Sequence, residues 1–342
     1  MTREILVVTD RPPRPDRDEG SVRLSRLLDA LAEIGWNVTL ATSSAELADH
    51  LRDEGARYDA VLLSRPDVAS AHLASVRAHA PQALLLYDTV DLHFLREYRG
   101  ARLKKSRPAL ERALARKAQE LELVRAADRT LVVSDDEREV LDEECPGASV
   151  YVVGNVHEAP GSQAPFEARS GALFVGGFAH APNADAAGDL VDEIWPLVRR
   201  AAPGLELTIV GAHPPAGLGG EGILVTGAVD RVEPYLDACR VSVAPLRFGA
   251  GVKGKVLASM GRGVPVVGSA VAFEGIPVRD GEEALVVEGP EETADAVVRL
   301  HGDAGLWARL SAAGTALVAE RYSPAAAADA LAAALGPEPV RA

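Results

Sequence analysis

The sequence predicts an α/β protein with two doubly wound, Rossmann-like domains that face each other across a cleft. Three observations support this prediction. Short apolar runs alternate with segments of helical periodicity, which is typical of a parallel sheet with helices on both faces. The alternation stops at residues 155–170, a stretch that contains proline, glycine and serine, and then begins again. A length of 342 residues is enough for two domains that each bury a core.

The first half of the chain contains six apolar runs that we expect to form strands. They are residues 5–9, 38–41, 60–63, 83–87, 131–133 and 150–153. After the first run, leucine and isoleucine recur at helical spacing up to Ile34, and Gly35 stands where a glycine commonly ends a helix. A longer helix is predicted for residues 108–127. Its expected apolar stripe is Leu110, Leu114, Ala118, Leu121 and Val124.

The second half repeats the pattern with six more strand candidates and ends in a helical tail. The candidates are residues 172–175, 205–210, 223–225, 241–244, 265–267 and 284–287. From Pro290 onward the chain is predicted to be helical, with an interruption at residues 322–324. We therefore predict an N-terminal domain over residues 1–160 and a second domain over residues 161–321. The tail, residues 322–342, is expected to pack back on the N-terminal domain.

The composition is that of an acidic globular protein, and it excludes several classes of function. The net charge of −14 argues against a general nucleic-acid binder. No apolar run approaches the roughly 20 residues of a membrane-spanning helix, and the chain begins with a strand candidate rather than a secretory signal. Cys145 and Cys239 are too few for a disulfide framework or a metal cluster. We expect a cytoplasmic protein without a metal site.

One segment departs from this acidic character. Residues 96–117, which begin with Arg96 and end with Lys117, carry nine basic side chains against Glu97 and Glu111, an excess of +7. The segment is either the solvated face of a helix or a surface for an anionic partner. Such a partner could be an anionic acceptor or the inner face of a membrane, to which the protein would bind peripherally.

The stretch with the clearest chemical signature is residues 244–269. A strand candidate leads there into a loop with several glycines and the cations Arg247, Lys253 and Lys255, and a short helix follows that Gly263 ends. Glycines let backbone amides approach a ligand closely, a helix N-terminus favours negative charge, and lysines add positive charge. The combination indicates a phosphate-binding site.

Several further motifs extend over both halves of the chain. The second half contains L-F-V-G-G-F-A-H-A-P-N-A-D-A from Leu173, L-T-I-V-G from Leu207 and G-A-V-D-R-V-E-P-Y-L from Gly227. The first half contains P-D-R-D-E-G-S-V-R from Pro15, Y-D-A-V-L-L-S-R-P from Tyr58, Y-D-T-V-D-L-H-F-L-R from Tyr87 and N-V-H-E from Asn155. In their order and spacing, these motifs and the phosphate-binding stretch resemble family 4 retaining glycosyltransferases (glycosyl transferases group 1). The resemblance implies the GT-B fold.

The resemblance also implies a nucleotide-diphosphate sugar donor, bound mainly by the second domain, and no metal or other cofactor. Lys253 and Lys255 are the predicted catalytic residues of this domain, because they would hold the departing diphosphate. The backbone amides that would assist them belong to Gly249, Ala250, Gly251, Val252 and Gly254. Arg247 is predicted to contact a phosphate or the acceptor. The alternative is that Arg247, Lys253 and Lys255 are charged side chains of a solvated loop and bind no ligand.

Three further residues of the second domain, Val229, Asp230 and Arg231, lie where the loop that binds the nucleobase runs in this family. We expect them to act mainly through backbone groups.

The first domain is expected to hold the acceptor, and its site residues also follow from the resemblance. Gly20 and Ser21 match the loop that faces the donor sugar and phosphates, although they could simply begin a helix. His93 matches a histidine that contacts the donor sugar and is the third predicted catalytic residue, unless it is structural. Asp88 and Asp91, in the same loop, are candidates for binding hydroxyl groups of the acceptor or sugar.

The chain departs from the family at two positions. Members usually carry Glu-x7-Glu across the phosphate-binding loop and helix, and here Ala250 and Ala258 occupy those positions. The second glutamate binds the ribose hydroxyls, so that its loss is expected to weaken donor binding. Ser259 could offer a shorter, neutral hydrogen bond, and Glu274 could compensate in part.

We therefore predict a retaining glycosyltransferase of hexosyltransferase type that moves a sugar to an acceptor hydroxyl. The acceptor could be a polysaccharide precursor, a lipid-linked sugar or a small natural product. A first alternative is a catalytically weakened homologue that binds a nucleotide sugar or assists another glycosyltransferase. A second alternative is a nucleotide-sugar epimerase on the same fold.

Overall fold

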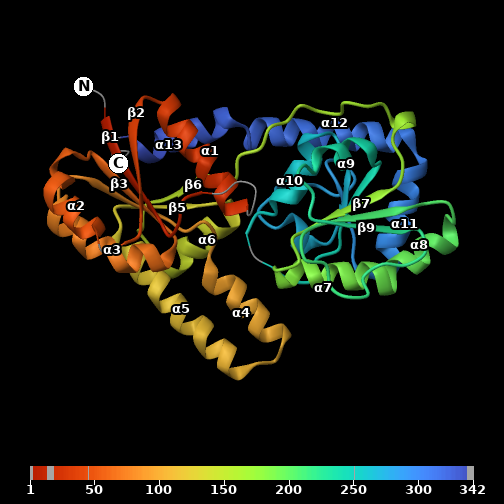
Figure 1. Cartoon of the computed structure of the whole chain (residues 1–342), viewed down its shortest axis with the longest axis horizontal. Coiled ribbons are helices and arrows are strands. Elements are labelled where there is room, and N and C mark those ends of the chain that lie inside the picture. The colour runs from red at the N-terminus through yellow and green to blue at the C-terminus, as the bar shows by residue number, and fades with distance from the viewer. Residues whose placement is uncertain (1–2, 14–18, 45, 250, 337–342) are drawn as a thin grey trace. The chain divides into compact units, whose positions relative to one another are not determined.

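The chain passes twice between two structural units (Figure 1). Unit 1 comprises Met1–Val156 and Pro324–Ala342, and unit 2 comprises His157–Ser323. The structure is a computed structural model that describes residues 3–13, 19–44, 46–249 and 251–336. Its C-terminal helix is therefore part of the unit that also contains the N-terminal strand.

Unit 1 contains a six-stranded sheet in the order β2-β1-β3-β4-β5-β6, in which all neighbours pair in parallel. Its strands are β1 (Arg3–Thr9), β2 (Trp36–Thr42), β3 (Ala60–Ser64), β4 (Leu84–Asp88), β5 (Arg129–Val132) and β6 (Val150–Val152). The chain leaves β1 toward β2 on one side and later continues through β3 on the other. The carboxyl ends of β1 and β3 thus mark a topological switch point, where open α/β sheets bind ligands.

Seven α-helices and a short 3₁₀ helix are described in unit 1. They are α1 (Glu19–Glu33), α2 (Glu46–Glu54), η1 (Gly55–Arg57), α3 (Pro66–His79), α4 (His93–Leu103), α5 (Arg107–Ala126), α6 (Asp135–Glu144) and α13 (Pro324–Leu335). Helix α1 ends before Gly35, whose positive φ of 89° suits glycine. Helix α13 packs against α1, and Leu331 and Ala334 are fully buried there.

Unit 2 repeats this architecture with the sheet order β12-β11-β10-β7-β8-β9, again with parallel neighbours only. Its strands are β7 (Ala172–Val175), β8 (Leu207–Val210), β9 (Ile223–Gly227), β10 (Val241–Ala244), β11 (Val266–Gly268) and β12 (Leu285–Val286). Here the switch point lies between β7 and β10, because the chain continues from β7 to one side and from β10 to the other.

The helices described in unit 2 are listed in chain order. They are η2 (Phe166–Ala168), α7 (Ala181–Asp189), η3 (Leu190–Ile194), α8 (Trp195–Ala201), α9 (Glu233–Ala238), α10 (Gly254–Gly261), η4 (Ala270–Phe273), α11 (Gly289–Gly302) and α12 (Ala304–Arg321). Asp303 separates the last two and caps α12, because its carboxylate accepts the N–H of Leu306 at 2.9 Å. None of the helices in the described part of the chain has the length and apolar character that crossing a lipid bilayer requires.

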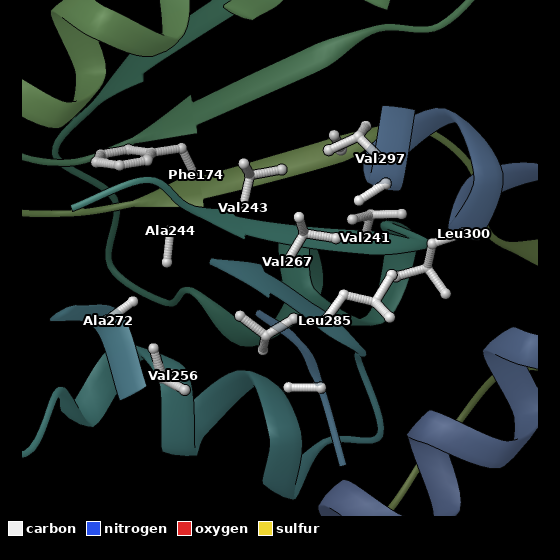
Figure 2. Close-up of a cluster of buried hydrophobic side chains, with 14 of the residues drawn as sticks. Phe174, Val241, Val243, Ala244, Val256, Val267, Ala272, Leu285, Val297 and Leu300 are labelled. Carbon is white, nitrogen blue, oxygen red and sulfur yellow. The ribbon is translucent and has the colours of Figure 1, made fainter. Parts of the chain in front are cut away.

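In the core of unit 2, the helix that follows the predicted phosphate-binding loop packs against the sheet. Figure 2 shows the side chains of α10, η4 and α11 gathered around those of the central strands. The labelled members of this cluster are Phe174, Val241, Val243, Ala244, Val256, Val267, Ala272, Leu285, Val297 and Leu300. Because Val256 and Leu257 are fully buried, α10 is held in place by packing and its N-terminus has a defined position.

The predicted fold class is confirmed, since each of the twelve strand candidates overlaps a strand of the two parallel sheets. The predicted stripe of α5 was wrong in part. Leu114 is 51% exposed and Ala118 is exposed, whereas Ala113, Leu121 and Val124 are buried. The reason is tertiary, because the first half of α5 extends away from the sheet and packs mainly on α4 (Figure 1).

Candidate functional site

In unit 2, the side chain of Lys255 lies near the switch point between β7 and β10. Its Nζ donates a hydrogen bond to Asn183 Oδ1 at 2.8 Å and lies 4.5 Å from the centre of the Phe174 ring. Within the described residues, no carboxylate lies within ion-pair distance of this amine. Burial, together with the charge of Lys253, lowers the pKa of Lys255 to about 7.

Lys253 lies just before α10 and has a different environment. Its Nζ donates to the carbonyl of Gly251 at 2.5 Å and lies 3.3 Å from Glu274 Oε2. The side chains of Lys253 and Glu274 are only 10% and 17% exposed. Glu274, which was predicted to compensate in part for the missing family glutamates, thus forms an ion pair with Lys253.

Arg247, at the start of the same loop, is held by two carboxylates of α7. Its Nε and Nη2 donate to the two oxygens of Asp185 at 2.8 and 2.5 Å, and its Nη1 donates to Asp189 at 3.1 Å. The hydrogen bond to Asp185 raises the pKa of Arg247 above its already high ordinary value. This arrangement favours a role in anchoring the loop to α7, and the predicted phosphate contact stays a prediction.

Glycines bring backbone groups close together beside Lys255. A Cβ on Gly211, at the end of β8, would lie 1.9 Å from the carbonyl oxygen of Gly176, and a Cβ on Gly176 would lie 2.8 Å from the Asn183 side chain. Gly251 has a φ of 70°, in the left-handed region that favours glycine. The loop then enters α10, whose first-turn amides and helix dipole favour an anion. Gly249, Val252 and Gly254 belong to this loop and helix start, whereas Ala250 lies outside the described residues.

The positions of the missing family carboxylates differ in what surrounds them. Ala258 is partly exposed on α10. Ser259 is buried; its Oγ donates to the carbonyl of Lys255 and shares a hydrogen bond with the hydroxyl of Ser242, both at 2.9 Å. Ser259 therefore joins α10 to β10, and this favours a structural role over a hydrogen bond to a ligand.

The predicted base-binding loop follows β9. Val229 packs against a small apolar cluster, Asp230 and Arg231 are exposed, and Arg231 lies 3.6 Å from Glu233. Their proposed contacts with a nucleobase are untested by this geometry.

In unit 1, Gly20 and Ser21 lie in the first turn of α1 and line a small polar pocket at the carboxyl ends of β1, β3 and β4. Asp88 also lines this pocket but is fully buried, and its Oδ2 accepts from Arg23 Nη1 at 2.9 Å and from Ser64 Oγ at 3.1 Å. Arg23 also donates to the carbonyl of Val153 at 2.9 Å. The geometry favours a buried ion pair for Asp88 rather than a freely accessible hydroxyl ligand.

Two residues that line the same pocket have strained backbones. Arg65, after β3, has a φ of 83°, and Val90, after β4, has a φ of 65°. A left-handed conformation is costly for a β-branched residue and costs on the order of 1–3 kcal/mol. Such strain commonly occurs at functional sites, and here it identifies the loop that leads from Asp88 to His93.

Asp91 and His93 lie together at the start of α4. His93 Nε2 is 3.0 Å from Asp91 Oδ1, and Arg96 forms an ion pair with the same carboxylate. Burial opposes the ionisation of Asp91, but His93 and Arg96 hold its pKa below the usual range. The Asp91 carboxylate thus lies beside the imidazole, although the contact lacks the geometry of a hydrogen bond.

Two buried glutamates hold the backbone of this loop. Glu120 of α5 accepts the N–H groups of His93 and Phe94 at 3.1 and 2.8 Å, and Glu137 of α6 accepts those of Leu92 and Val133 at 3.1 and 3.3 Å. Burial raises the pKa of each carboxyl group to about 7, against the effect of these hydrogen bonds. They are positioning residues for the loop.

Sequence reasoning assigned no role to several residues that shape these sites. They are Arg23, Ser64, Arg65, Glu120, Glu137, Phe174, Asn183 and Asp185. Most lie in motifs that the sequence analysis had quoted, so that a signal existed without an assigned role. Glu120 and Glu137 lie outside those motifs. Their roles could not be predicted, because a single charged residue in a helix gives no sign of whether it is buried.

Comparison with known proteins agrees with this geometry. Residues 169–303 match the family model described as glycosyl transferases group 1. No curated protein is similar enough in sequence to be counted as a relative.

Solved structures show the same fold at low sequence identity. Sucrose-phosphate synthase from Thermosynechococcus elongatus is 16% identical, with 96% of this chain and 97% of that chain covered and a TM-score of 0.70. HepE from Anabaena in complex with UDP-glucose is 13% identical, with 96% and 98% covered and a TM-score of 0.67. TarM from S. aureus is 11% identical, with 85% and 58% covered and a TM-score of 0.66.

Both units thus have the parallel α/β architecture of GT-B glycosyltransferases, and the family match lies on the unit that contains the lysine loop. The chain has the GT-B fold, and residues 169–303 of unit 2 match the family of group 1 glycosyl transferases.

Proposed function

We propose that this protein is a retaining glycosyltransferase that moves a hexose from a nucleotide-diphosphate sugar to an acceptor hydroxyl without a metal ion. The observation that carries the proposal is Lys255, an amine at the switch point of unit 2 whose described neighbours are an amide oxygen and an aromatic ring. Lys255 is partly buried and has no carboxylate partner among the described residues, which is costly for a cation, and a diphosphate would supply the missing negative charge.

The proposed chemistry needs stabilisation of the leaving diphosphate more than it needs a general base. Lys253, Lys255 and the amides of Gly249 to Gly254 would hold the two phosphates and stabilise the charge that develops when the sugar leaves. The predicted contact of His93 with the donor sugar is part of the proposal, as are hydroxyl contacts of Asp91. Gly20, Ser21, Arg247 and the loop of Val229, Asp230 and Arg231 remain proposed donor contacts.

UDP-glucose is the first donor to test, because HepE has been solved with it. The assay measures donor hydrolysis and transfer for several nucleotide sugars, over a panel of polysaccharide precursors, lipid-linked sugars and small natural products. The anomeric configuration of the product is read by NMR, and inversion would contradict the retaining mechanism.

A second candidate function is a nucleotide-sugar binder with weakened catalysis, which the alanine at 258 favours. Tight donor binding without turnover over the whole panel would support it.

An Ala258→Glu variant tests the ribose argument directly, because the partly exposed position on α10 has room for a longer side chain. We expect donor affinity to increase about tenfold or more, as charge-assisted hydrogen bonds contribute about 1.5–3 kcal/mol. Unchanged or weaker affinity would mean that the missing carboxylate is not a simple loss. Interconversion of the donor sugar without transfer would instead indicate an epimerase.

A further inference from the structure

Helices α4 and α5 form a hairpin that extends away from the sheet of unit 1 (Figure 1). The first buried residue of α5 is Ala113, and its other buried residues are Glu120 and beyond. The end of the hairpin, residues 102–114, is called the hairpin tip below. It lies farthest from the sheet that holds the rest of the unit together.

The hairpin tip is strongly basic. It contains the exposed cations Arg102, Lys104, Lys105, Arg107 and Arg112 and one acidic residue, Glu111, for a net charge of +4. Arg107 pairs with Glu111 at 3.2 Å. Among the described residues, no carboxylate lies within ion-pair distance of Lys104, Lys105 or Arg112.

The base of the hairpin differs from its tip. There Arg96 pairs with Asp91, Arg116 with Asp67 at 2.5 Å, and Lys117 with Glu144 at 2.6 Å. The basic segment found in the sequence therefore has two parts. Its base is neutralised within the unit, and its tip is not.

The tip also presents an apolar side chain. Leu114 is 51% exposed and is one of three exposed large hydrophobic residues among those described. Arg107, Glu111 and Leu114 follow one another at i, i+4 and i+7, so they share a face of α5. That face therefore presents an exposed leucine beside one ion pair, and the unpaired cations Lys104, Lys105 and Arg112 lie elsewhere on the tip. An exposed apolar side chain close to several cations suits the boundary between lipid headgroups and acyl chains.

The rest of the chain is acidic, with −14 minus +4, or −18, outside the tip. A helix of 20 residues such as α5 is about 30 Å long, whereas charges are screened beyond about 8 Å at physiological salt. The tip can thus approach a negative surface while the sheet of unit 1 stays beyond the range of electrostatic repulsion.

We propose that the hairpin tip binds an anionic phospholipid surface. The end of the hairpin presents the cations that flank the connection between its two helices, and the lipid boundary offers an apolar environment to Leu114 that a nucleic acid or a soluble polyanion lacks. The proposal concerns a surface of unit 1 and does not depend on the proposed function.

The test is sedimentation of the full-length protein with two kinds of vesicle, one of pure phosphatidylcholine and one containing about one third phosphatidylglycerol. The tip variant is Lys104→Ala/Lys105→Ala/Arg112→Ala. Its matched control, Arg52→Ala/Arg138→Ala/Arg200→Ala, removes three exposed arginines elsewhere. We expect the wild type and the control to bind only the anionic vesicles, and the tip variant to bind them about 100-fold more weakly, at about fivefold for each cation.

A second variant, Leu114→Ser, tests the apolar part of the contact and should weaken vesicle binding without altering its dependence on salt. The proposal is overturned if the wild-type protein does not bind anionic vesicles, or if the tip variant binds them as tightly as the control does. So does binding to heparin or duplex DNA that the tip variant loses while vesicle binding is absent. Transfer to a soluble acceptor is measured in parallel and should not change in the tip variant, so a failure here is distinct from a failure of the proposed function.

Discussion

Two loops of this protein, the one after β4 in unit 1 and the one after β10 in unit 2, both lead from a parallel strand into a helix. They differ in whether each charged side chain has a counter-charge within the fold. In the first loop, Asp88 pairs with Arg23 and Asp91 with Arg96. In the second, Arg247 pairs with Asp185 and Lys253 with Glu274. Lys255 contacts an amide oxygen and an aromatic ring and has no carboxylate within ion-pair distance among the described residues. The carboxylates at the first site therefore have counter-charges within the fold, whereas Lys255 at the second site lacks an anion that a ligand would supply.

The largest effect is expected from breaking the buried pair of unit 1. Asp88→Asn leaves the Arg23 guanidinium buried without its counter-charge, and this should lower the free energy of unfolding by about 3–5 kcal/mol. Urea denaturation of the purified variant measures the loss. A cost below about 1 kcal/mol would mean that the pair is less isolated from water than its burial indicates.

Lys255→Met should lower activity but not stability, in contrast to Asp88→Asn. Removing the amine that would hold the diphosphate should lower the rate of sugar transfer about 100- to 1,000-fold. Stability should stay the same or increase, because a partly buried amine with a lowered pKa is replaced by an apolar chain of similar length. Rates come from a donor-turnover assay and stability from urea denaturation, with Lys117→Met as a lysine control. A variant that loses stability and keeps its activity would mean that Lys255 has a structural role and does not hold a ligand.

A smaller effect is expected from Glu120→Gln. A carboxamide has one acceptor oxygen where the carboxylate has two, so the N–H of His93 or of Phe94 loses its partner, at about 1–3 kcal/mol of stability. The NMR shifts of the His93 ring should also move. Glu122→Gln, on the exposed face of the same helix, is the matched control and should behave like the wild type. Equal behaviour of the two variants would refute the positioning role.

The smallest effect is a pH dependence of donor binding. Lys255 has a pKa of about 7 in the folded protein, below its ordinary value of 10.5, and a bound diphosphate would raise it. Above pH 7 the free protein must take up a proton to bind, so affinity should fall by about tenfold per pH unit up to the pKa of the complex. Calorimetry in buffers of different ionisation enthalpy detects this proton uptake, and Lys255→Met should abolish it.

The same shift affects folding. Between the folded pKa of about 7 and the ordinary value of 10.5, the unfolded chain binds more protons than the folded one. The contribution of Lys255 to stability therefore rises with pH through this range. Thermal unfolding of the wild type and Lys255→Met at pH 7 and pH 9 isolates this contribution, and an equal change in both would contradict the assignment.

The sequence by itself determined the alternation of strands and helices, the repeated α/β pattern and the place of the lysine loop. These follow from local signals, because apolar runs, helical spacing and glycine positions act over a few residues. The C-cap of α1 at Gly35 and the end of α10 before Gly263 are of this kind.

Only the tertiary structure decided which charges are paired. Arg23 and Asp88 are 65 residues apart, Lys255 and Asn183 are 72 apart, and Arg247 and Asp185 are 62 apart. It also decided that Leu114 faces solvent and that Glu120 does not. The burial of a charge depends on what the other strands and helices place around it. A periodic pattern along one helix cannot contain that information, and for this reason the lysine loop could be located from the sequence whereas its missing counter-charge could not.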